Sequence, residues 1–474
     1  MPTRNTASFK QGRGGQRGAV LMVMLVLLVV SVAAILVNSL TTTSLKNARQ
    51  AQTAAALAQA KDALIGYAVT YGDTHSGQVH GYLPCPDYGG GNPEGSAEPV
   101  CGSQNVSVIG RLPWATLDLS TLRDGGGECL WYAVSGTYKN NPPTGLMNWD
   151  TNGQFQTYSS DGTLLASQVV AVIIAPGATL SGQNRSGTAA PICGGNYTAS
   201  NYLDNDTVHS INNSIVSTGN FIQGASSGSV NDQMLFITQQ DIWNAVQKRT
   251  DFQPRDPNNP FQPNPNNPLT ILTQQVALCL ANYGNHNSPY NYSLPWAAQL
   301  SLSDYSVDTN YNDTSNLLAG RAPYLVGTSG YTTGNTLGNL MTTASCGVAW
   351  TSVDSWWNNW KDHLFYAISY SYRPTSSTNQ YCGTCVQVNT LGQYAAVIMF
   401  AGPRLIPPLS TLNQTRVNKS VVADYLESPN SSNVSAPNGS QNYASSPVAS
   451  STFNDVVCVI NPNTSLQGLT VTCP

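Results

Sequence analysis

Residues with the types and spacing needed for chemistry are few in this chain. His75 and His80 lie close in sequence to Asp73 and Asp87, a grouping that suits metal binding or general acid–base chemistry. With five histidines in 474 residues, such proximity arises easily by chance. Residues 224–228, GASSG, fit the G-x-S-x-G pattern, but they lack the strand and helix that a nucleophile elbow needs on either side. We therefore predict a flexible loop there, no catalytic residue and no enzyme activity.

Two stretches rich in Asp and Asn supply oxygen ligands of the kind that Ca²⁺ prefers. They span residues 149–153 and 304–313, and neither fits the spacing of an EF-hand loop. Turn formation by Asp, Asn and Gly is the simpler interpretation of both. We predict no cofactor, with a structural Ca²⁺ ion as the one alternative left open.

A group of tryptophans could serve either a surface or a core. Exposed, these residues would form an adhesive or sugar-binding face; buried, they would fill the interior, which is the interpretation we favour. The group comprises Trp350, Trp356, Trp357 and Trp360.

The elements that must position these residues begin with an apolar segment. Residues 1–18 contain Arg and Lys but no acid, and residues 19–37 contain no charge. A stretch of that length is sufficient to cross a bilayer as one helix. Positive charge before it predicts a cytoplasmic N-terminus and export of everything after Asn38. Because no Gly or Pro occurs from 19 to 65, we expect one helix of about 47 residues and roughly 70 Å.

This N-terminus resembles that of the type IV pilin and pseudopilin superfamily. The match is Gln16-Arg17-Gly18 followed by Ala19-Val20-Leu21-Met22-Val23. The resemblance implies cleavage between Gly18 and Ala19 by a prepilin peptidase, and a helix that packs against other subunits in a filament. Most such subunits carry Glu where this chain has Val23, and a subunit at a filament tip can lack it. An uncleaved signal anchor and a cleaved signal peptide are the alternatives.

All ten cysteines follow the apolar run. An even number in an exported chain predicts disulfides. Nearest-neighbour pairing suggests Cys85–Cys101, Cys382–Cys385 and Cys458–Cys473. The spacing of Cys382 and Cys385 also occurs in zinc sites, but a disulfide that closes a tight turn is the simpler interpretation. Four cysteines remain without an assigned partner: Cys129, Cys193, Cys279 and Cys346.

The chain repeats itself internally. Gly110-Arg111-Leu112-Pro113-Trp114 matches Gly320-Arg321-Ala322-Pro323-Tyr324, and residues 130–135 match 364–369. Near the end of each copy, Tyr202-Leu203-Asp204 matches Tyr425-Leu426-Glu427, and Asn231-Asp232 follows at the same offset as Asn454-Asp455. We predict two structural copies of one module, of which only the first has the long helix.

A proline- and asparagine-rich segment separates the copies. Its prolines predict an extended, semi-rigid spacer, and Thr238 to Asp241 predict a helix N-cap just before it. Short β-branched and aromatic runs at 129–135, 169–174, 363–372 and 394–400 predict strands. The predicted organisation is a leader (1–18), a transmembrane segment (19–37), a first module (38–250), a linker (251–269) and a second module (270–474).

Composition bounds the function. Only 9% of residues are charged, against a usual value of about 25%, and the net charge of −4 offers no basic surface for nucleic acid. The predicted fold class is α+β, with a membrane-spanning helix and two pilin-like, β-rich heads. We predict a minor pilin or tip-like pseudopilin of a type IV pilus or type II secretion pseudopilus, located in the inner membrane before it enters a periplasmic or extracellular filament. Its expected partners are that membrane, other subunits and the peptidase. The alternative is an anchored adhesin or carbohydrate-binding protein that enters no filament.

Overall fold

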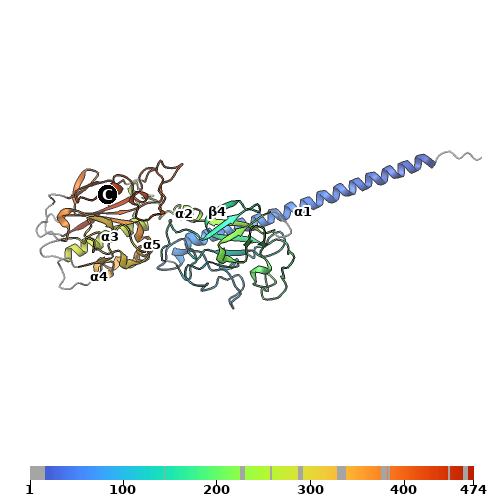
Figure 1. The fold of residues 1–474 in the computed structure, drawn as a ribbon, viewed down its shortest axis with the longest axis horizontal. Coiled ribbons are helices and arrows are strands. Elements are labelled where there is room, and N and C mark those ends of the chain that lie inside the picture. Colours follow the sequence, from blue (N-terminus) through green and yellow to red (C-terminus); the bar gives the residue numbers. More distant parts are fainter. Residues whose placement is uncertain are drawn as a thin grey trace, which may run out of the picture.

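The computed structural model describes the chain from residue 16, with short gaps. The described ranges are 16–143, 145–224, 230–256, 259–286, 292–327, 338–374, 382, 385–446, 449–462 and 468–473. The side chains of residues 16–42, 255, 259–263 and 345 lie outside the description. The sequence forms an α+β fold with one long N-terminal helix and a β-rich body (Figure 1).

The N-terminal helix is continuous and longer than predicted. Helix α1 runs from Gln16 to Thr74. Residues 43–52 are exposed, and burial begins at Thr53 and continues on one face through Leu57, Leu64 and Ala68. We call residues 16–52 the protruding part of α1; Figure 1 shows it leaving the body at the end opposite the second module. At 1.5 Å per residue it is roughly 55 Å long.

The prediction of a membrane-spanning helix is wrong on this structure. Over the part of the chain whose side chains are described, no helix has both the length and the apolar character needed to cross a bilayer. The described part of α1 is unsuited to a bilayer because it carries Lys46, Arg49, Lys61 and Asp62. Residues 19–37, on which the prediction rested, lie in α1 where side chains are outside the description. The predicted inner-membrane location rested on a membrane-spanning helix, so it is corrected by the same finding.

The first module contains a six-stranded sheet. Its strand order is β1-β2-β4-β3-β7, with β8 also paired to β4. Side chains alternate between the faces, as a pleated strand requires: Tyr132 and Ile173 face α1, whereas Trp131 and Ile174 face a separate apolar cluster. The strands are β1 (Val108–Arg111), β2 (Trp131–Val134), β3 (Phe155–Tyr158), β4 (Leu164–Ala175), β7 (Asn220–Ile222) and β8 (Gln233–Thr238).

The second module contains a five-stranded sheet in the order β11-β14-β17-β19-β20. Helix α3 (Pro268–His286) packs on β17 and β19, in the way that α1 packs on β4 and β8. The strands are β11 (Ala319–Arg321), β14 (Leu364–Ile368), β17 (Ala396–Phe400), β19 (Val456–Asn461) and β20 (Thr470–Thr472). The runs predicted as strands at 129–135, 363–372 and 394–400 thus contain β2, β14 and β17, whereas the run at 169–174 covers only the second half of β4.

The repeated anchors occupy matching positions in the two sheets. Arg111 pairs with Trp131 in the β1–β2 register, and Arg321 pairs with Phe365 in the β11–β14 register. The glycine before each arginine allows close approach of a second backbone, because a Cβ on Gly110 would lie 2.7 Å from a carbonyl oxygen and one on Gly320 would lie 2.0 Å from another. These matched contacts support the interpretation that the chain contains two copies of one module.

The linker is folded rather than extended. Strands β9 (Arg255–Asp256) and β10 (Asn259–Pro263) pair antiparallel. The buried Asn264 amide donates to the carbonyls of Thr250 (2.9 Å) and Gln253 (3.0 Å), which ties the segment to itself. Before it, Thr238 and Asp241 form the predicted capping box of α2 (Gln239–Val246).

Five disulfides join the ten cysteines that were predicted to be oxidised. The three predicted pairs are present, and the four unassigned residues pair as Cys129–Cys193 and Cys279–Cys346. Shorter elements complete the fold: α4 (Thr343–Cys346), α5 (Asp354–Trp360), α6 (Asn430–Ser435), β5 (Asn205–Asp206), β6 (Ile211–Asn212), β12 (Leu325–Val326), β13 (Gly338–Asn339), β15 (Val386–Val388), β16 (Leu391–Tyr394) and β18 (Asn442–Tyr443).

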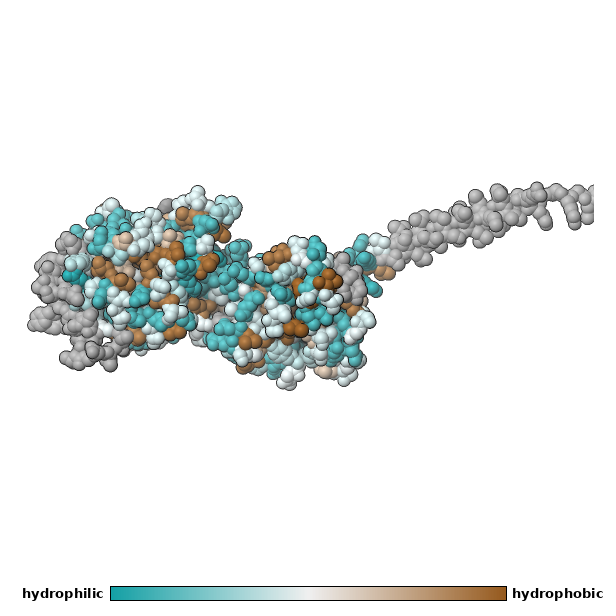
Figure 2. Space-filling model, in the orientation of Figure 1, coloured by the Kyte–Doolittle hydropathy of each residue, from teal (hydrophilic) through white to brown (hydrophobic). Residues whose placement is uncertain are grey.

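The surface is polar with scattered apolar residues. Figure 2 shows small hydrophobic areas distributed over both modules among polar residues, and a narrowing where the modules meet.

Candidate functional site

The two modules meet at a buried junction, formed by residues 147–150 of the first module and residues 354–363, 404, 416 and 419 of the second. The side-chain oxygen of Asn359 accepts from the Met147 amide at 2.7 Å, and its carbonyl accepts from the Asn148 side chain at 2.8 Å. Asn359 stands near the end of α5 (Asp354–Trp360), so this short helix contacts the first module through one residue that accepts both of these hydrogen bonds from it.

The tryptophan group lies at this junction and is mostly buried. Trp357 and Trp360 are fully buried, and Trp350 is nearly so. The Trp360 ring contacts Trp149 edge-on at 4.5 Å and Trp243 at 5.4 Å, both from the first module. The core-filling interpretation is confirmed, and the core in question is shared by both modules.

Charged groups fill the inner end of the junction. The Asp150 carboxylate lies 2.9 Å from His363 Nε2, 3.1 Å from Arg416 and 3.3 Å from Arg404. His363 Nδ1 lies 2.9 Å from Asp362. The Asp362 carboxylate also pairs with Lys419. Cations from the second module thus neutralise a buried carboxylate from the first.

Burial and charge act in opposite directions on these acids. Burial alone favours the protonated form of Asp150, but Arg416, His363 and Arg404 outweigh it and lower the pKa to about 2. Asp362 is fully buried, and Lys419 and His363 still hold its pKa well below the usual range. Both acids remain charged at neutral pH, so the junction is held by full ion pairs in a low-dielectric site.

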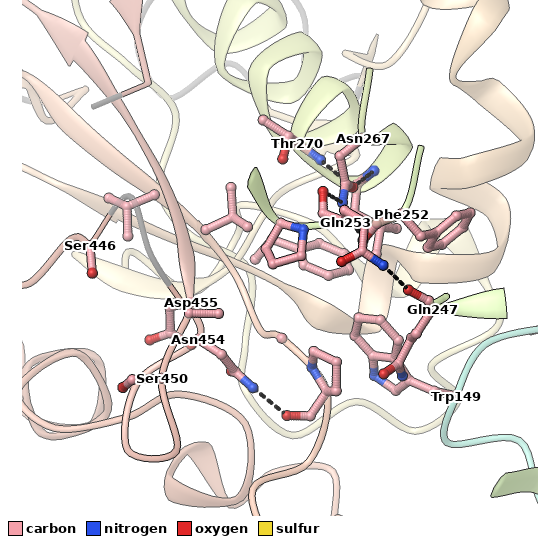
Figure 3. Close-up of a pocket in the computed structure, with 18 residues that line it drawn as sticks. Trp149, Gln247, Phe252, Gln253, Asn267, Thr270, Ser446, Ser450, Asn454 and Asp455 are labelled. Atoms are coloured by element: carbon pink, nitrogen blue, oxygen red, sulfur yellow. Dashed lines mark hydrogen bonds between the residues drawn. The ribbon is translucent and has the colours of Figure 1, made fainter. Parts of the chain in front are cut away.

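A cavity of about 370 Å³ opens beside the junction (Figure 3). Trp149 and Gln247 of the first module, Phe252 of the linker, and Phe400 and Asn454 of the second module are among its lining residues. We call this cavity the junction pocket. Its size falls within the usual range for small-molecule sites.

The predicted acid–base grouping does not assemble. Asp73 pairs with Arg249 at 2.7 Å, and the Asp87 carboxylate accepts from the backbone of Gly89 and Gly95. His75 stacks on a tyrosine ring, whereas His80 is buried beside Phe252. Among the described residues, no three His, Cys, Asp or Glu side chains are arranged to hold a metal ion. Residues 225–228 of the GASSG motif lie outside the description.

The acid-rich stretches form turns and ion pairs. Asp304 accepts from the Ser306 amide at 2.8 Å, and Asp308 pairs with Lys361. Asp150, in the other stretch, is engaged at the junction. Cys382 and Cys385 form a disulfide, so their sulfurs are not zinc ligands. Gly18 and Ala19, the predicted processing site, lie in α1 where side chains are outside the description.

Sequence analysis missed the charged groups of the junction. Asp150 and His363 stand 213 residues apart, and Asp150 and Arg416 stand 266 apart. No spacing rule connects residues at such separations. The one available signal was the low overall charge. In a chain with so few charged residues, those that are buried together are expected to have a structural role.

No protein-family model, curated protein or solved structure matches this chain. Its function is therefore inferred from its own sequence and geometry.

Proposed function

We propose that the chain is a non-catalytic structural subunit of the minor-pilin or tip-like pseudopilin type. In this proposal the protruding part of α1 packs against helices of other subunits, and the two modules are displayed at the far end. The observation that carries the proposal is the 59-residue helix whose exposed residues 43–52 separate its buried C-terminal part from the N-terminal remainder.

Helix chemistry supports assembly through α1. Residues 19–37 of this helix are uncharged and apolar in sequence, and a helix that is apolar on all sides is stable when other apolar surfaces enclose it. Over the part of α1 whose side chains are described, the body encloses the helix from Thr53 onward. Helices from other subunits would supply the missing enclosure, as the resemblance at residues 16–23 implies.

Module arrangement supports distal display. The second module lies at the opposite end of the molecule from the protruding part of α1 (Figure 1). The junction holds the modules together through buried ion pairs and aromatic contacts. Five disulfides stabilise loops in a chain with few charged residues.

Site-specific cross-linking tests this proposal. All ten cysteines form disulfides, so an added cysteine is the single free thiol. Leu45 on α1 is 60% exposed, and Val208 on the body is 79% exposed. We expect Leu45→Cys to give cross-links to other subunits in producing cells treated with a bismaleimide, and Val208→Cys to give far fewer. Equal yields from the two variants would contradict assembly through α1.

Processing gives a second test. We expect mass spectrometry to find Ala19 as the mature N-terminus, and Gly18→Leu to leave the chain full-length. A tip-like subunit should also be present in trace amounts per filament. An intact leader on the wild-type chain would contradict the pilin type, whereas a high copy number would contradict only the tip-like position.

A further inference from the structure

The junction pocket is a built cavity that the proposed assembly does not use. Its walls come from the end of α2, the linker, the start of α3 and the loops beside β17 and β19. Each module supplies only part of the wall, so the pocket exists because the modules are docked. Figure 3 shows Gln247, Phe252, Asn267 and Asn454 arranged around it.

The lining is free of positive charge. Among the described residues that line the pocket, none is Lys, Arg or His. Burial and the neighbouring Glu427 raise the pKa of Asp455, the one acid in the lining, well above its ordinary value. A neutral lining gives no Coulombic attraction to a phosphate, a carboxylate or a cation.

Neutral hydrogen-bonding groups are instead abundant. The lining combines aromatic side chains with amides and hydroxyls, which is the composition that suits a ligand with apolar faces and many hydroxyl groups. Its aromatic residues are Trp149, Phe252 and Phe400, and its amide residues are Gln247, Gln253, Asn267 and Asn454.

Gln247 is the amide most available to a ligand. Asn267 is engaged in capping α3 and in bonds to the Phe252 and Gln253 carbonyls. The side chain of Gln247, by contrast, has no hydrogen-bond partner within the described part of the chain and is half-buried at the pocket wall.

Strand topology disfavours an extended peptide. The pocket lies beside β17 and β19, and both are interior strands, since β17 pairs with β14 and β19 while β19 pairs with β17 and β20. A peptide that adds to a sheet needs a free strand edge. Neither strand offers one here.

We propose that the junction pocket binds a neutral saccharide. The cavity of about 370 Å³ admits roughly one or two sugar rings. Sugar C–H faces lie against the aromatic rings, and sugar hydroxyls bond to Gln247 and neighbouring amides. Binding at this place also favours the docked arrangement of the two modules, because both contribute to the wall. This inference stands apart from filament assembly, which concerns α1.

Calorimetric titration of the full chain with defined probes tests the proposal. The probes are lactose, cellobiose, maltose and N,N′-diacetylchitobiose, with inorganic phosphate and trialanine as the charged and peptide comparators. We expect saturable binding of at least one disaccharide. Gln247→Ala should weaken it about tenfold, whereas Gln59→Ala, an exposed change on α1, should leave it unchanged.

A second variant blocks the pocket without disturbing the core. Ala449 is an exposed lining residue, and Ala449→Trp should abolish disaccharide binding while the melting temperature stays near that of the wild type. The proposal is overturned if no disaccharide binds at up to roughly 10 mM, if phosphate or trialanine binds more tightly, or if binding survives both pocket variants. Failure here would leave the cross-linking result at Leu45 unaffected.

Discussion

The two modules share one arrangement of strands, but their buried arginines contact different groups. Arg111 lies over Tyr202 at 4.9 Å and donates to the carbonyls of Gly194 and Asn196, beside the Cys129–Cys193 disulfide. Arg321 lies over Tyr425 at 4.7 Å and donates to the Asp362 carbonyl.

The two arginines differ in the segments that they contact. The first arginine stabilises a loop within its own module. The second contacts the residue whose carboxylate helps to hold His363 at the junction. The matching arginine of the second module therefore contacts the backbone of a residue that belongs to the junction.

The largest effect expected is loss of the central cation of the junction. Arg416→Ala leaves the buried Asp150 without its closest arginine, which should lower the free energy of unfolding by about 3–5 kcal/mol. Arg404→Ala is the matched control: this arginine is 28% exposed and more distant from the same carboxylate, so we expect about 1 kcal/mol or less. Urea unfolding of both variants measures the difference. Equal losses would contradict the argument that burial and proximity to Asp150 give Arg416 the larger effect.

The next effect concerns two disulfides, one in each module, that close loops of very different length. Removing Cys129–Cys193, a separation of 64 residues, by a double Ala substitution should cost about 4 kcal/mol through the entropy of the unfolded chain. Removing Cys382–Cys385, a separation of 3, should cost about 2 kcal/mol on the same basis. Thermal unfolding of the two double variants compares them. A larger loss from the short loop would contradict the loop-length argument.

Sequence reasoning succeeded where the cause was local. Short β-branched and aromatic runs located β2 and β14, the Thr238 capping box located α2, and close spacing identified three disulfides. The anchor repeat also placed Arg111 and Arg321 at matching positions beside aromatic partners.

It failed where partners come from distant segments. Cys279 and Cys346 were left unassigned because 67 residues separate them and nothing local marks the pair. The linker was predicted to be an extended spacer because it is rich in proline. That prediction did not consider Asn264, whose side-chain amide donates to backbone carbonyls in a segment where the prolines have no N–H to donate. The charged groups of the junction and the junction pocket exist only after the modules dock.

A moderate effect is expected from a buried acid pair that both modules repeat. Burial, and then the charge of Asp204, raise the pKa of Asp232 well above its ordinary value. The folded chain therefore keeps a proton that the unfolded chain releases above about pH 4. Its stability should fall as the pH rises from there through the folded pKa. Asp150 does not obscure this, because its pKa of about 2 leaves its contribution constant above about pH 5.

Asp232→Asn removes the titration while it keeps an acceptor for the Asn213 side chain. Each unit of raised pKa corresponds to about 1.4 kcal/mol, so the variant should lose less stability between pH 5 and pH 8 than the wild type. Melting temperatures at the two pH values measure this. Asp455→Asn is the matched change in the second module, where Asn430 takes the place of Asn213. An unchanged pH slope in both variants would contradict the interpretation that these buried acids stay protonated in the folded chain.

The smallest effect gives the sharpest test of duplication. Tyr132 and Tyr366 are both fully buried, and their hydroxyls donate to the carbonyls of Pro84 at 3.2 Å and Pro295 at 3.0 Å. Each Tyr→Phe change removes one buried hydrogen bond with almost no change in volume, which should cost about 1 kcal/mol. Because the two tyrosines hold equivalent strands to equivalent proline loops, we expect equal losses in urea unfolding, and additive losses in the double variant since the sites lie in separate modules. A loss confined to Tyr132→Phe would show that the second module does not depend on this contact in the way the first module does.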